Sequence, residues 1–329
     1  MAEAAADCLA AGIDSLKIEG RMRDIEYVSL LVDSYRQAID RYFEGTVVSL
    51  DEDSVWKNLY DRRIRDFSSG SVFGPTSAKD VGFKGEREPA LATGPEKLKG
   101  LNAEDYCPAE PVSSRDLRLS VKIGNRDGLN AAIEKKVDTI IVPGCLTNGQ
   151  DKFKSIEDIE WAVKEAKANG IEVVIELPRI VMAPDQGLVD AIFELAKKEK
   201  VTAVMVHDPG SFLRAFASGI KAWGGYGLNL TNSKAFEQVR LWNADRACPS
   251  LEMTGKDFKV VSESAPVALE VMVHGPQCGA ITDFCILSSL DGGEKDQCSG
   301  RCQTDHFFLE DRLGQKYPLV FDGQCRCHI

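Results

Sequence analysis

The chain has 329 residues, of which 43% are hydrophobic and 28% are charged, and its formal net charge is −11 with a pI near 5.0. It contains no run of eighteen apolar residues, and its N-terminus lacks the pattern of a secretion signal, so we expect a cytoplasmic protein that neither crosses a membrane nor is exported. The negative charge disfavours broad attraction to a nucleic-acid backbone but leaves room for an RNA held at a local basic patch.

The first 83 residues form one predicted domain. Periodic apolar residues predict a helix over Ala2–Ala11 and an amphipathic helix over Ile25–Phe43, with a short strand at Ser15–Ile18 between them. Residues 84–116 then collect four prolines among charges and glycines, a composition typical of a connector between packed bodies. We therefore predict a domain boundary in this segment.

Residues 117–329 form the second predicted domain, in which apolar strands alternate with amphipathic helices such as Ile156–Asn169 and Gly187–Lys200. This alternation predicts a parallel sheet with crossover helices. Seven such units suit a (β/α)8 barrel that lacks one strand. A doubly wound dinucleotide-binding sheet is disfavoured because Gly124–Gly128, after the first strand, lacks the third glycine of that motif. The predicted strands are Leu117–Ile123, Thr139–Val142, Glu172–Leu177, Ala203–His207, Ala222–Leu228, Arg246–Cys248 and Leu269–His274.

Six of the ten cysteines lie in the last fifty-two residues. In a reducing compartment, clustered thiolates serve more often as metal ligands or redox groups than as structural disulfides. An iron–sulfur cluster, a structural zinc site and a tail stapled by disulfides all remain open at this point. The scattered Cys8, Cys107, Cys145 and Cys248 are each explained as small, partly buried apolar residues, and we assign them no role.

Several short motifs resemble the peptidase U32 family, also called the collagenase-like peptidases. The stretch Asp14–Met22 is similar to the signature of that family, and it is followed by Glu26–Val28. Later segments resemble the family barrel at Gly124–Asn125, Leu228–Asn232 and Val273–Gly275. Together these matches extend over most of the chain.

The order of these motifs differs from that of one complete family domain, because the strand at Lys17–Arg21 normally closes the barrel and here comes first. The resemblance therefore implies an α/β fold in which an incomplete (β/α)8 TIM-type barrel, truncated before its last strand, follows the C-terminal end of another family barrel. A rearranged strand order is the alternative. A further hypothesis is that Leu16–Glu19 serves as a surrogate eighth strand between the strands of Leu119 and Val271.

The resemblance also implies a cofactor, since the family includes oxygen-independent hydroxylation proteins that look like holders of a [4Fe-4S] cluster. Soft sulfur ligands suit such a cluster, and each of its four irons needs one outer ligand. Zinc is the alternative metal. Matched to the family pattern after His274–Gly275, the implied ligands are Cys278, Cys285, Cys298 and Cys325, with Cys302 and Cys327 as alternates.

Polar residues at predicted strand ends are candidates for catalysis, because binding groups of barrels lie at the carboxyl ends of their strands. Glu19 and Arg21 could bind a carboxylate, a phosphate or a base edge, or could simply pair with neighbouring charges. His274 ends the last predicted strand and His207 ends another, and each could donate a proton or be a hydrogen-bonded structural histidine.

Two asparagines near another strand end are candidates for substrate binding. Asn229 and Asn232 could orient a polar ligand. Asparagine also caps helices, and a helix is expected to begin near Ser233, so a purely structural role for this pair stays open.

Three functions compete. Hydroxylation of a tRNA or rRNA base is the first choice, with ubiquinone precursors behind it, because a redox centre explains the clustered thiols. A peptidase is the alternative that the family name states, but the chain has neither His-Glu-x-x-His nor Gly-x-Ser-x-Gly, and a cysteine nucleophile would need His274 or His306 nearby. The third candidate function is a noncatalytic scaffold in which the cluster only holds the loops together.

Overall fold

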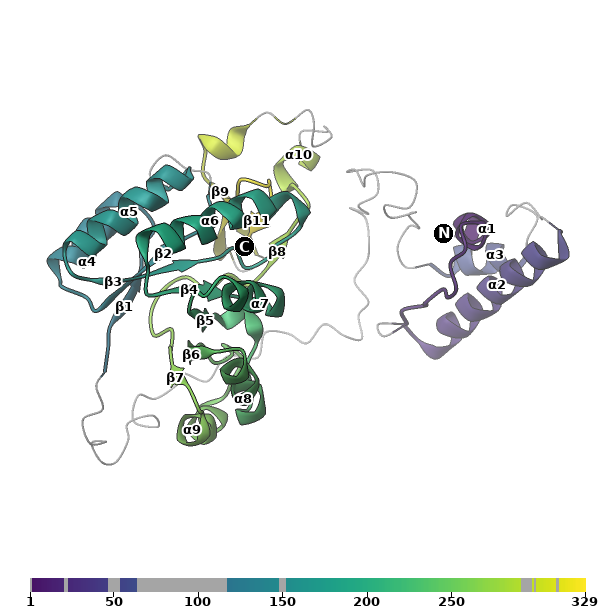
Figure 1. Cartoon of the computed structure of the whole chain (residues 1–329). Coiled ribbons are helices and arrows are strands. Elements are labelled where there is room, and N and C mark those ends of the chain that lie inside the picture. Colours follow the sequence, from purple (N-terminus) through teal and green to yellow (C-terminus); the bar gives the residue numbers. More distant parts are fainter. Residues whose placement is uncertain are drawn as a thin grey trace. The chain divides into compact units, whose positions relative to one another are not determined.

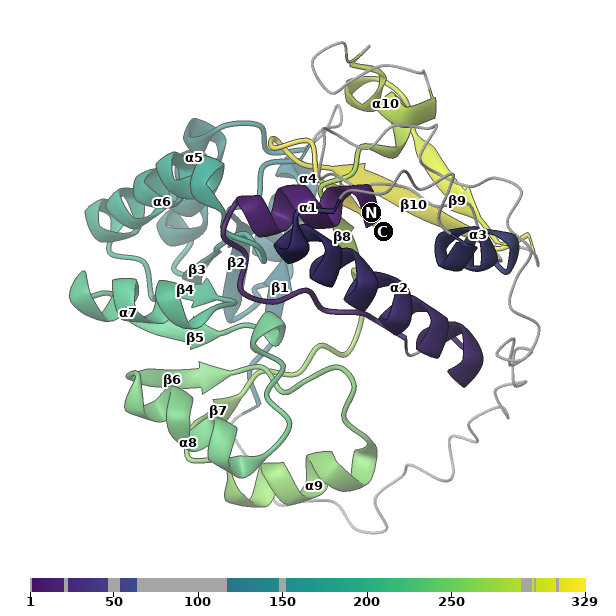
Figure 2. The ribbon, with the colours of Figure 1, turned by 90° about the vertical axis from the view of Figure 1, so that its right-hand side faces the viewer.

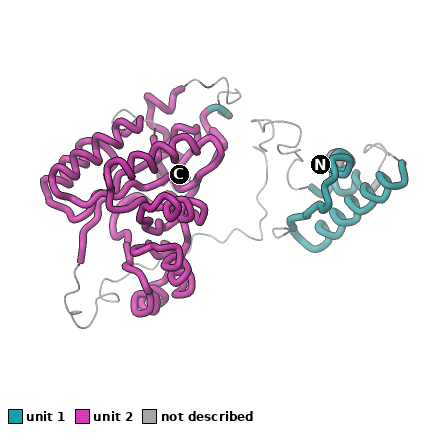
Figure 3. Tube along the Cα trace, in the orientation of Figure 1, with its two compact units in different colours: residues 1–111, 288–298 teal, residues 112–287, 299–329 magenta. Residues whose placement is uncertain are grey.

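The computed structural model describes residues 2–20, 23–46, 54–63, 117–147, 152–290, 298, 300–311 and 314–329. The chain divides into two compact units, which Figures 1 and 3 show. Unit 1 comprises residues 1–111 and 288–298, and unit 2 comprises residues 112–287 and 299–329. The predicted connector at 84–116 lies outside the described residues, so its role stays a prediction.

Residues 2–63 of unit 1, where described, contain three helices, α1 (Ala2–Ala10), α2 (Ile25–Glu44) and α3 (Ser54–Asp61). Asp24 begins α2 by accepting a hydrogen bond from the Tyr27 amide at 2.7 Å, and Gly45 ends it with a φ of 70°. Both predicted helices of this unit are confirmed.

The predicted strand at Ser15–Ile18 is wrong, because these residues have no regular secondary structure and belong to neither described sheet. A strand requires a hydrogen-bonded neighbour, and the other described residues of unit 1 are helical or irregular. The hypothesis of a surrogate eighth strand at Leu16–Glu19 is therefore not supported.

Unit 2 is built on a parallel sheet of seven strands in the order of the sequence, curled as in a TIM-like barrel (Figure 2). Neighbouring strands pair in register, as in Ser120 with Thr139 and Thr139 with Glu172. The predicted α/β fold with crossover helices is thus confirmed. The strands are β1 (Ser120–Lys122), β2 (Thr139–Pro143), β3 (Glu172–Glu176), β4 (Ala203–Val206), β5 (Ala222–Gly224), β6 (Ala244–Ala247) and β7 (Ala268–Leu269).

Two hydrophobic clusters lie on opposite faces of this sheet. On β3, Val173 and Ile175 pack in the large core that the helices also line, whereas Val174 packs with Met205 and Trp223 in a small cluster on the opposite face. This alternation follows from the two-residue period of a strand. The helices that connect the strands are α4 (Arg126–Glu134), α5 (Ile156–Ala168), α6 (Gln186–Glu199), α7 (Pro209–Ala217), α8 (Ser233–Leu241) and α9 (Gly255–Ser264).

The sheet has an open edge at β7, where the prediction of a strand over Leu269–His274 is wrong beyond Leu269. The following apolar residues are exposed, and Val273 reaches 85% exposure. No eighth strand pairs with β7 in the described sheet, so the extended run lacks the hydrogen-bonded partner that would continue it. The predicted strand at Ala222–Leu228 likewise ends at Gly224 and turns into a 3-10 helix at Tyr226–Leu228.

A second, antiparallel sheet that was not predicted forms the C-terminal part of unit 2. Its strands are β8 (Ile281–Thr282), β9 (Phe307–Glu310), β10 (Lys316–Phe321) and β11 (Cys327–His328), in the order β8-β11-β10-β9. The short helix α10 (Ile286–Leu290) follows β8. The sheet meets the carboxyl end of β2, where the Gly323 amide donates to the Leu146 carbonyl at 3.0 Å. None of the described helices combines the length and apolarity needed to cross a bilayer.

Candidate active site and cysteine cluster

A cavity of about 250 Å³ lies at the carboxyl ends of the parallel strands. Lys122 is the last residue of β1, Glu176 is the last residue of β3, and His207 follows β4 directly. The C-terminal segment contributes Cys278, Ile281 and His328 to the wall, so two sheets enclose one cavity. Lys152, Arg179 and Tyr226 are further polar residues of the lining.

A buried carboxylate organises one wall of the cavity. The Lys122 ammonium lies 2.5 Å from Oε2 of Glu176, and the other carboxylate oxygen lies 3.3 Å from Nε2 of His207. The Gly227 amide donates to Nδ1 of His207 at 3.2 Å, so Nδ1 acts as an acceptor. It follows that Nε2 carries the proton and donates it to Glu176.

Glu176 is charged despite its burial because of its ion pair with Lys122. Burial alone would raise the pKa of this carboxyl, but Lys122 and the hydrogen bond from His207 overcome that effect and lower its pKa to about 2. Burial lowers the pKa of Lys122, whereas the charge of Glu176 and its hydrogen bond raise it. The net effect is a raised pKa. Both groups are therefore charged at neutral pH, and a cation faces the cavity beside a fixed carboxylate.

An aromatic and guanidinium pair connects this wall to the C-terminal segment. Arg179 lies over the Tyr226 ring with its Cζ 5.1 Å from the ring centroid, and it donates to the Cys278 carbonyl at 3.2 Å. Tyr226 also packs edge-on against His207 at 5.3 Å between centroids. Burial, followed by the charge of Glu176, raises the pKa of the Tyr226 hydroxyl, so this group is a neutral donor at physiological pH.

Gly225 is required by the close packing around His207. A Cβ atom at this position would lie 2.3 Å from the imidazole Cε1. We expect Gly225→Ala to lower the free energy of unfolding by about 1–3 kcal/mol, because the imidazole must leave its place between Glu176 and the Gly227 amide. Thermal unfolding measures the loss, and Gly187→Ala is the control, since nothing lies within 4 Å of the added methyl group. Equal stability of the two variants would contradict the packing argument.

Strand pairing brings several of the clustered cysteines together. Cys278 and Cys285 flank β8, and Cys327 lies on β11, which pairs with β8 through Cys327 and Thr282. Cys327 is buried among Leu319 and Phe321. Cys285 and Cys302 pack against the same apolar cluster. Pairing of β8 with β11 thus gathers Cys278, Cys285 and Cys327, and Cys302 packs against the same apolar cluster; we call these four residues the thiol group.

Two of the predicted ligands differ from the thiol group. Cys325 is exposed in the turn before β11 with a φ of 60°, and Cys298 is exposed in the segment that belongs to unit 1. Within the thiol group, burial followed by the nearby Cys285 and Cys278 raises the pKa of Cys327 to about 11. Cys327 is therefore a neutral thiol at physiological pH.

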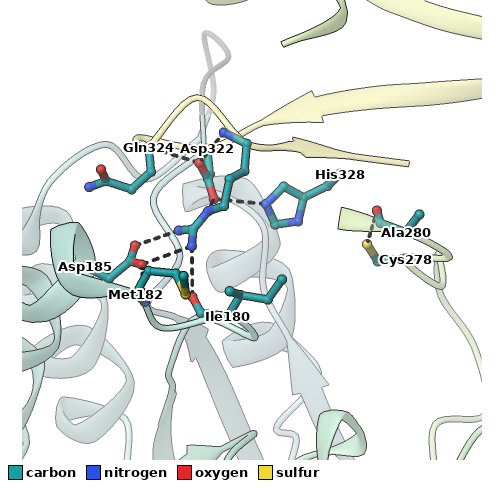
Figure 4. A network of polar contacts seen from close by, with 9 residues as sticks. Ile180, Met182, Asp185, Cys278, Ala280, Asp322, Gln324 and His328 are labelled. Atoms are coloured by element: carbon teal, nitrogen blue, oxygen red, sulfur yellow. Dashed lines mark hydrogen bonds and ion pairs between the residues drawn. The ribbon is translucent and has the colours of Figure 1, made fainter. Parts of the chain in front are cut away.

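A buried arginine, Arg326, fixes the C-terminal segment to the barrel, and its partners Ile180, Asp185 and Asp322 are labelled in Figure 4. Arg326 donates to both carboxylate oxygens of Asp185 at 2.6 and 3.0 Å, to Asp322 at 2.8 Å and to the Ile180 carbonyl at 3.1 Å. Ile180 and Asp185 follow β3, whereas Arg326 lies next to β11. These contacts hold Cys327 and His328 against the carboxyl ends of the strands.

The other predicted catalytic residues are not among the residues that line this cavity. Glu19 is exposed in unit 1 and pairs with Lys17 at 3.9 Å, while Arg21 lies outside the described residues. His274 is exposed five residues beyond the end of β7, so its predicted position at a strand end is wrong.

Neither Asn229 nor Asn232 is among the residues that line the cavity. Asn232 caps α8 by accepting from the Ala235 amide at 3.0 Å, which confirms its structural alternative. Asn229 accepts a hydrogen bond from the Ser250 hydroxyl at 2.5 Å.

Sequence reasoning missed Lys122, Glu176 and His328. A charged residue at the end of an otherwise apolar strand was the available signal for Lys122 and Glu176, because the carboxyl ends of barrel strands converge. His328, the residue directly before Ile329, carried no such signal. Cys145, which was given no role, also lines the cavity, and burial raises the pKa of its thiol to about 12.

Comparisons with known proteins place these features in context. The family model for peptidase family U32 matches residues 1–82 and 124–318. An uncharacterized protease of Methanocaldococcus jannaschii is 27% identical over 51% of this chain and 43% of its own length. A collagenase of Porphyromonas gingivalis is 22% identical over 63% of this chain and 54% of its own.

A tRNA hydroxylation protein P1 of Bacillus subtilis is 22% identical over 59% of this chain and 47% of its own length. The chain therefore spans about half the length of the curated relatives that it matches.

Proposed function

This chain belongs to peptidase family U32, and from that premise we propose that it binds a [4Fe-4S] cluster and takes part in oxygen-independent hydroxylation of a tRNA or rRNA base. The observation that carries the proposal is that Cys278 belongs both to the thiol group and to the cavity wall. A redox centre at the thiol group would therefore border the space where a substrate binds. The name of the tRNA hydroxylation relative supports the same chemistry.

The number and kind of donor atoms in the thiol group support this proposal. Cys278, Cys285, Cys302 and Cys327 supply four thiols, which is the number of outer ligands that a [4Fe-4S] cluster takes. Their surroundings are apolar on one side, with Leu319 and Phe321 in the same core. When bound, such a cluster supplies or accepts single electrons.

The side chains of the cavity are suited to hold and orient a substrate. Lys122 and Arg179 present cations or donors to an anionic or carbonyl oxygen, while Glu176 keeps Lys122 in place. His207 donates through Nε2 to Glu176, which fixes the carboxylate. Ile281, Val320 and His328 of the C-terminal sheet line the cavity beside the strand ends.

The size of the cavity supports a single base as the substrate. The cavity volume of about 250 Å³ is below the ~300–1,000 Å³ of typical ligand pockets. A single base turned out of its stack therefore suits this space better than a segment of a protein substrate does. Tyr226 and Arg179 offer flat surfaces on which a base stacks. Lys152 and Arg179 supply local positive charge with which an acidic chain could hold RNA, whereas Lys122 is already paired with Glu176.

Proteolysis is the second candidate, and the collagenase relative supports it. The predicted partners for a cysteine nucleophile, His274 and His306, are exposed and do not line the cavity. His328 does line it, with Cys145 nearby. A peptidase of this kind would use the cavity but not the thiol group. The arrangement in which residues 1–83 form the end of another family barrel stays a prediction.

The test begins with anaerobic purification and measurement of iron and sulfide. We expect a brown protein with about four irons and four sulfides per chain. Cys302→Ser and Cys327→Ser should lose most of this iron, whereas Cys298→Ser and Cys325→Ser, the matched controls, should keep it. Iron loss in the control variants instead would restore the ligands implied by the family pattern.

The activity is tested on RNA from cells with and without the protein. We expect a base heavier by one oxygen atom only in cells that carry the intact thiol group, as mass spectrometry of the nucleosides would show. A colourless, metal-free protein that cleaves gelatin would overturn the proposal in favour of the peptidase.

A further inference from the structure

A mixed set of side chains that the proposed function does not use meets at one side of the cavity. Cys145, Asp322 and His328 each place one potential ligand atom within 4.8 Å of the other two. Cys145 follows β2, Asp322 follows β10, and His328 ends β11. Cys145 and His328 also line the cavity, so a metal ion among these atoms would be reached from it.

Backbone pairing brings these distant segments together. Thr147 and Asp322 form an antiparallel bridge, and the Gly323 amide donates to the Leu146 carbonyl at 3.0 Å. These contacts fix the loop that carries Cys145 against the turn that carries Asp322. The three side chains are therefore positioned by the fold and not by a chance approach of flexible loops.

The carboxylate of Asp322 is held in one orientation. Its Oδ1 accepts hydrogen bonds from the Gln324 and Arg326 amides at 2.9 Å each. Its Oδ2 accepts from Nε of Arg326 at 2.8 Å and lies 3.1 Å from Nε2 of His328. Outer hydrogen bonds of this kind orient the ligands of metal sites.

The local charges favour a divalent cation. Asp185 and Asp322 are both buried, and Arg326 neutralises only one of them. A thiolate at Cys145 would add a second negative charge beside Asp322 and Glu176, and the nearby Arg326 and Lys122 offset it only in part. A doubly charged metal ion would balance both charges.

We propose that Cys145, Asp322 and His328 bind a zinc ion whose fourth position faces the cavity. One thiolate, one imidazole and one carboxylate are donors that zinc accepts together, and three protein ligands with an open position are typical of catalytic zinc sites. On binding, the Cys145 thiol releases its proton to solvent, and the imidazole binds through a nitrogen that carries none. This site is distinct from the thiol group, because it contains one sulfur and not four.

The experiment measures the sulfur content around zinc. The full chain, with its iron content determined beforehand, receives one equivalent of zinc, and X-ray absorption at the zinc edge reports the nearest atoms. We expect one sulfur at about 2.3 Å and nitrogen or oxygen neighbours at about 2.0–2.2 Å. A shell of four sulfurs would place the zinc in the thiol group and overturn the proposal.

Variants assign the ligands. Cys145→Ser should remove the sulfur from the zinc shell, and Cys145→Ser and His328→Gln should each weaken zinc binding by about tenfold or more in competition with a chelator. Cys248→Ser is the matched control, because Cys248 is also a partly buried cysteine of the barrel but lies outside the cluster. The unsubstituted chain gives the sulfur count even if one variant fails to fold. An unchanged spectrum and affinity for Cys145→Ser would overturn the site.

Discussion

Replacement of Arg326 with methionine is expected to lower the free energy of unfolding by about 3–5 kcal/mol. The side chain is 5% exposed, and its partners Asp185 and Asp322 are 3% and 2% exposed, so the variant leaves two buried carboxylates without their cation. Methionine preserves much of the apolar volume of the arginine stem. The expected loss therefore reflects charge and hydrogen bonding more than a cavity.

The pH dependence of this loss follows from Asp322. Burial would raise the pKa of its carboxyl, but hydrogen bonds from His328 and Arg326 lower it from 3.8 to about 2. A lowered pKa in the folded state means that the stabilisation is complete above pH 3.8 and disappears as the pH falls toward 2. The difference between the wild type and Arg326→Met should therefore shrink over the same interval.

Chemical denaturation at several pH values measures both effects. Arg118→Met is the matched control, because Arg118 forms an ion pair with Glu172 in which both side chains are exposed. Such a surface pair contributes about 0–1 kcal/mol. If Arg326→Met cost no more than Arg118→Met, the buried network would not be what holds the C-terminal segment in place.

Replacement of Glu176 with glutamine is expected to lower the free energy of unfolding by about 2–3 kcal/mol at neutral pH. The carboxylate is buried, with its side chain 8% exposed, and it accepts from Lys122 and His207. Glutamine keeps the shape and can still accept from His207, but it removes the charge that stabilises Lys122. The cavity then loses the carboxylate that fixes its cation.

The sign of the pH effect is the same as for Asp322. The pKa of Glu176 falls from 4.5 to about 2 in the folded chain, so its stabilisation is present above pH 4.5 and is lost as the pH falls through 2. The stability of Glu176→Gln should approach that of the wild type in this interval. Unfolding midpoints at pH 7, 4 and 2.5 would show the convergence.

Glu172→Gln is the control for this change, since Glu172 begins the same strand and pairs at the surface with Arg118. We expect its effect to stay within about 1 kcal/mol. A stability difference between wild type and Glu176→Gln that does not change with pH would contradict the assigned ion pair.

Much of the barrel was predictable, because its signal is local. The apolar runs at Thr139–Val142 and Glu172–Leu177, with their flanking helices, have the periods of buried strands and amphipathic helices, and β2 and β3 confirm them. The predicted strand Leu269–His274 was wrong beyond Leu269. An apolar sequence alone does not make a strand where the sheet provides no further neighbour.

The sequence by itself determined the alternation of strands and helices, the family resemblance and the density of thiols near the C-terminus. Only the tertiary structure decided which groups meet. Pairing of β8 with β11 gathers Cys278, Cys285 and Cys327, and a buried arginine brings the last residues to the strand ends. The reason is physical: helix and strand patterns are set by neighbours along the chain, whereas a site depends on contacts between residues far apart in sequence, such as Asp185 and Arg326.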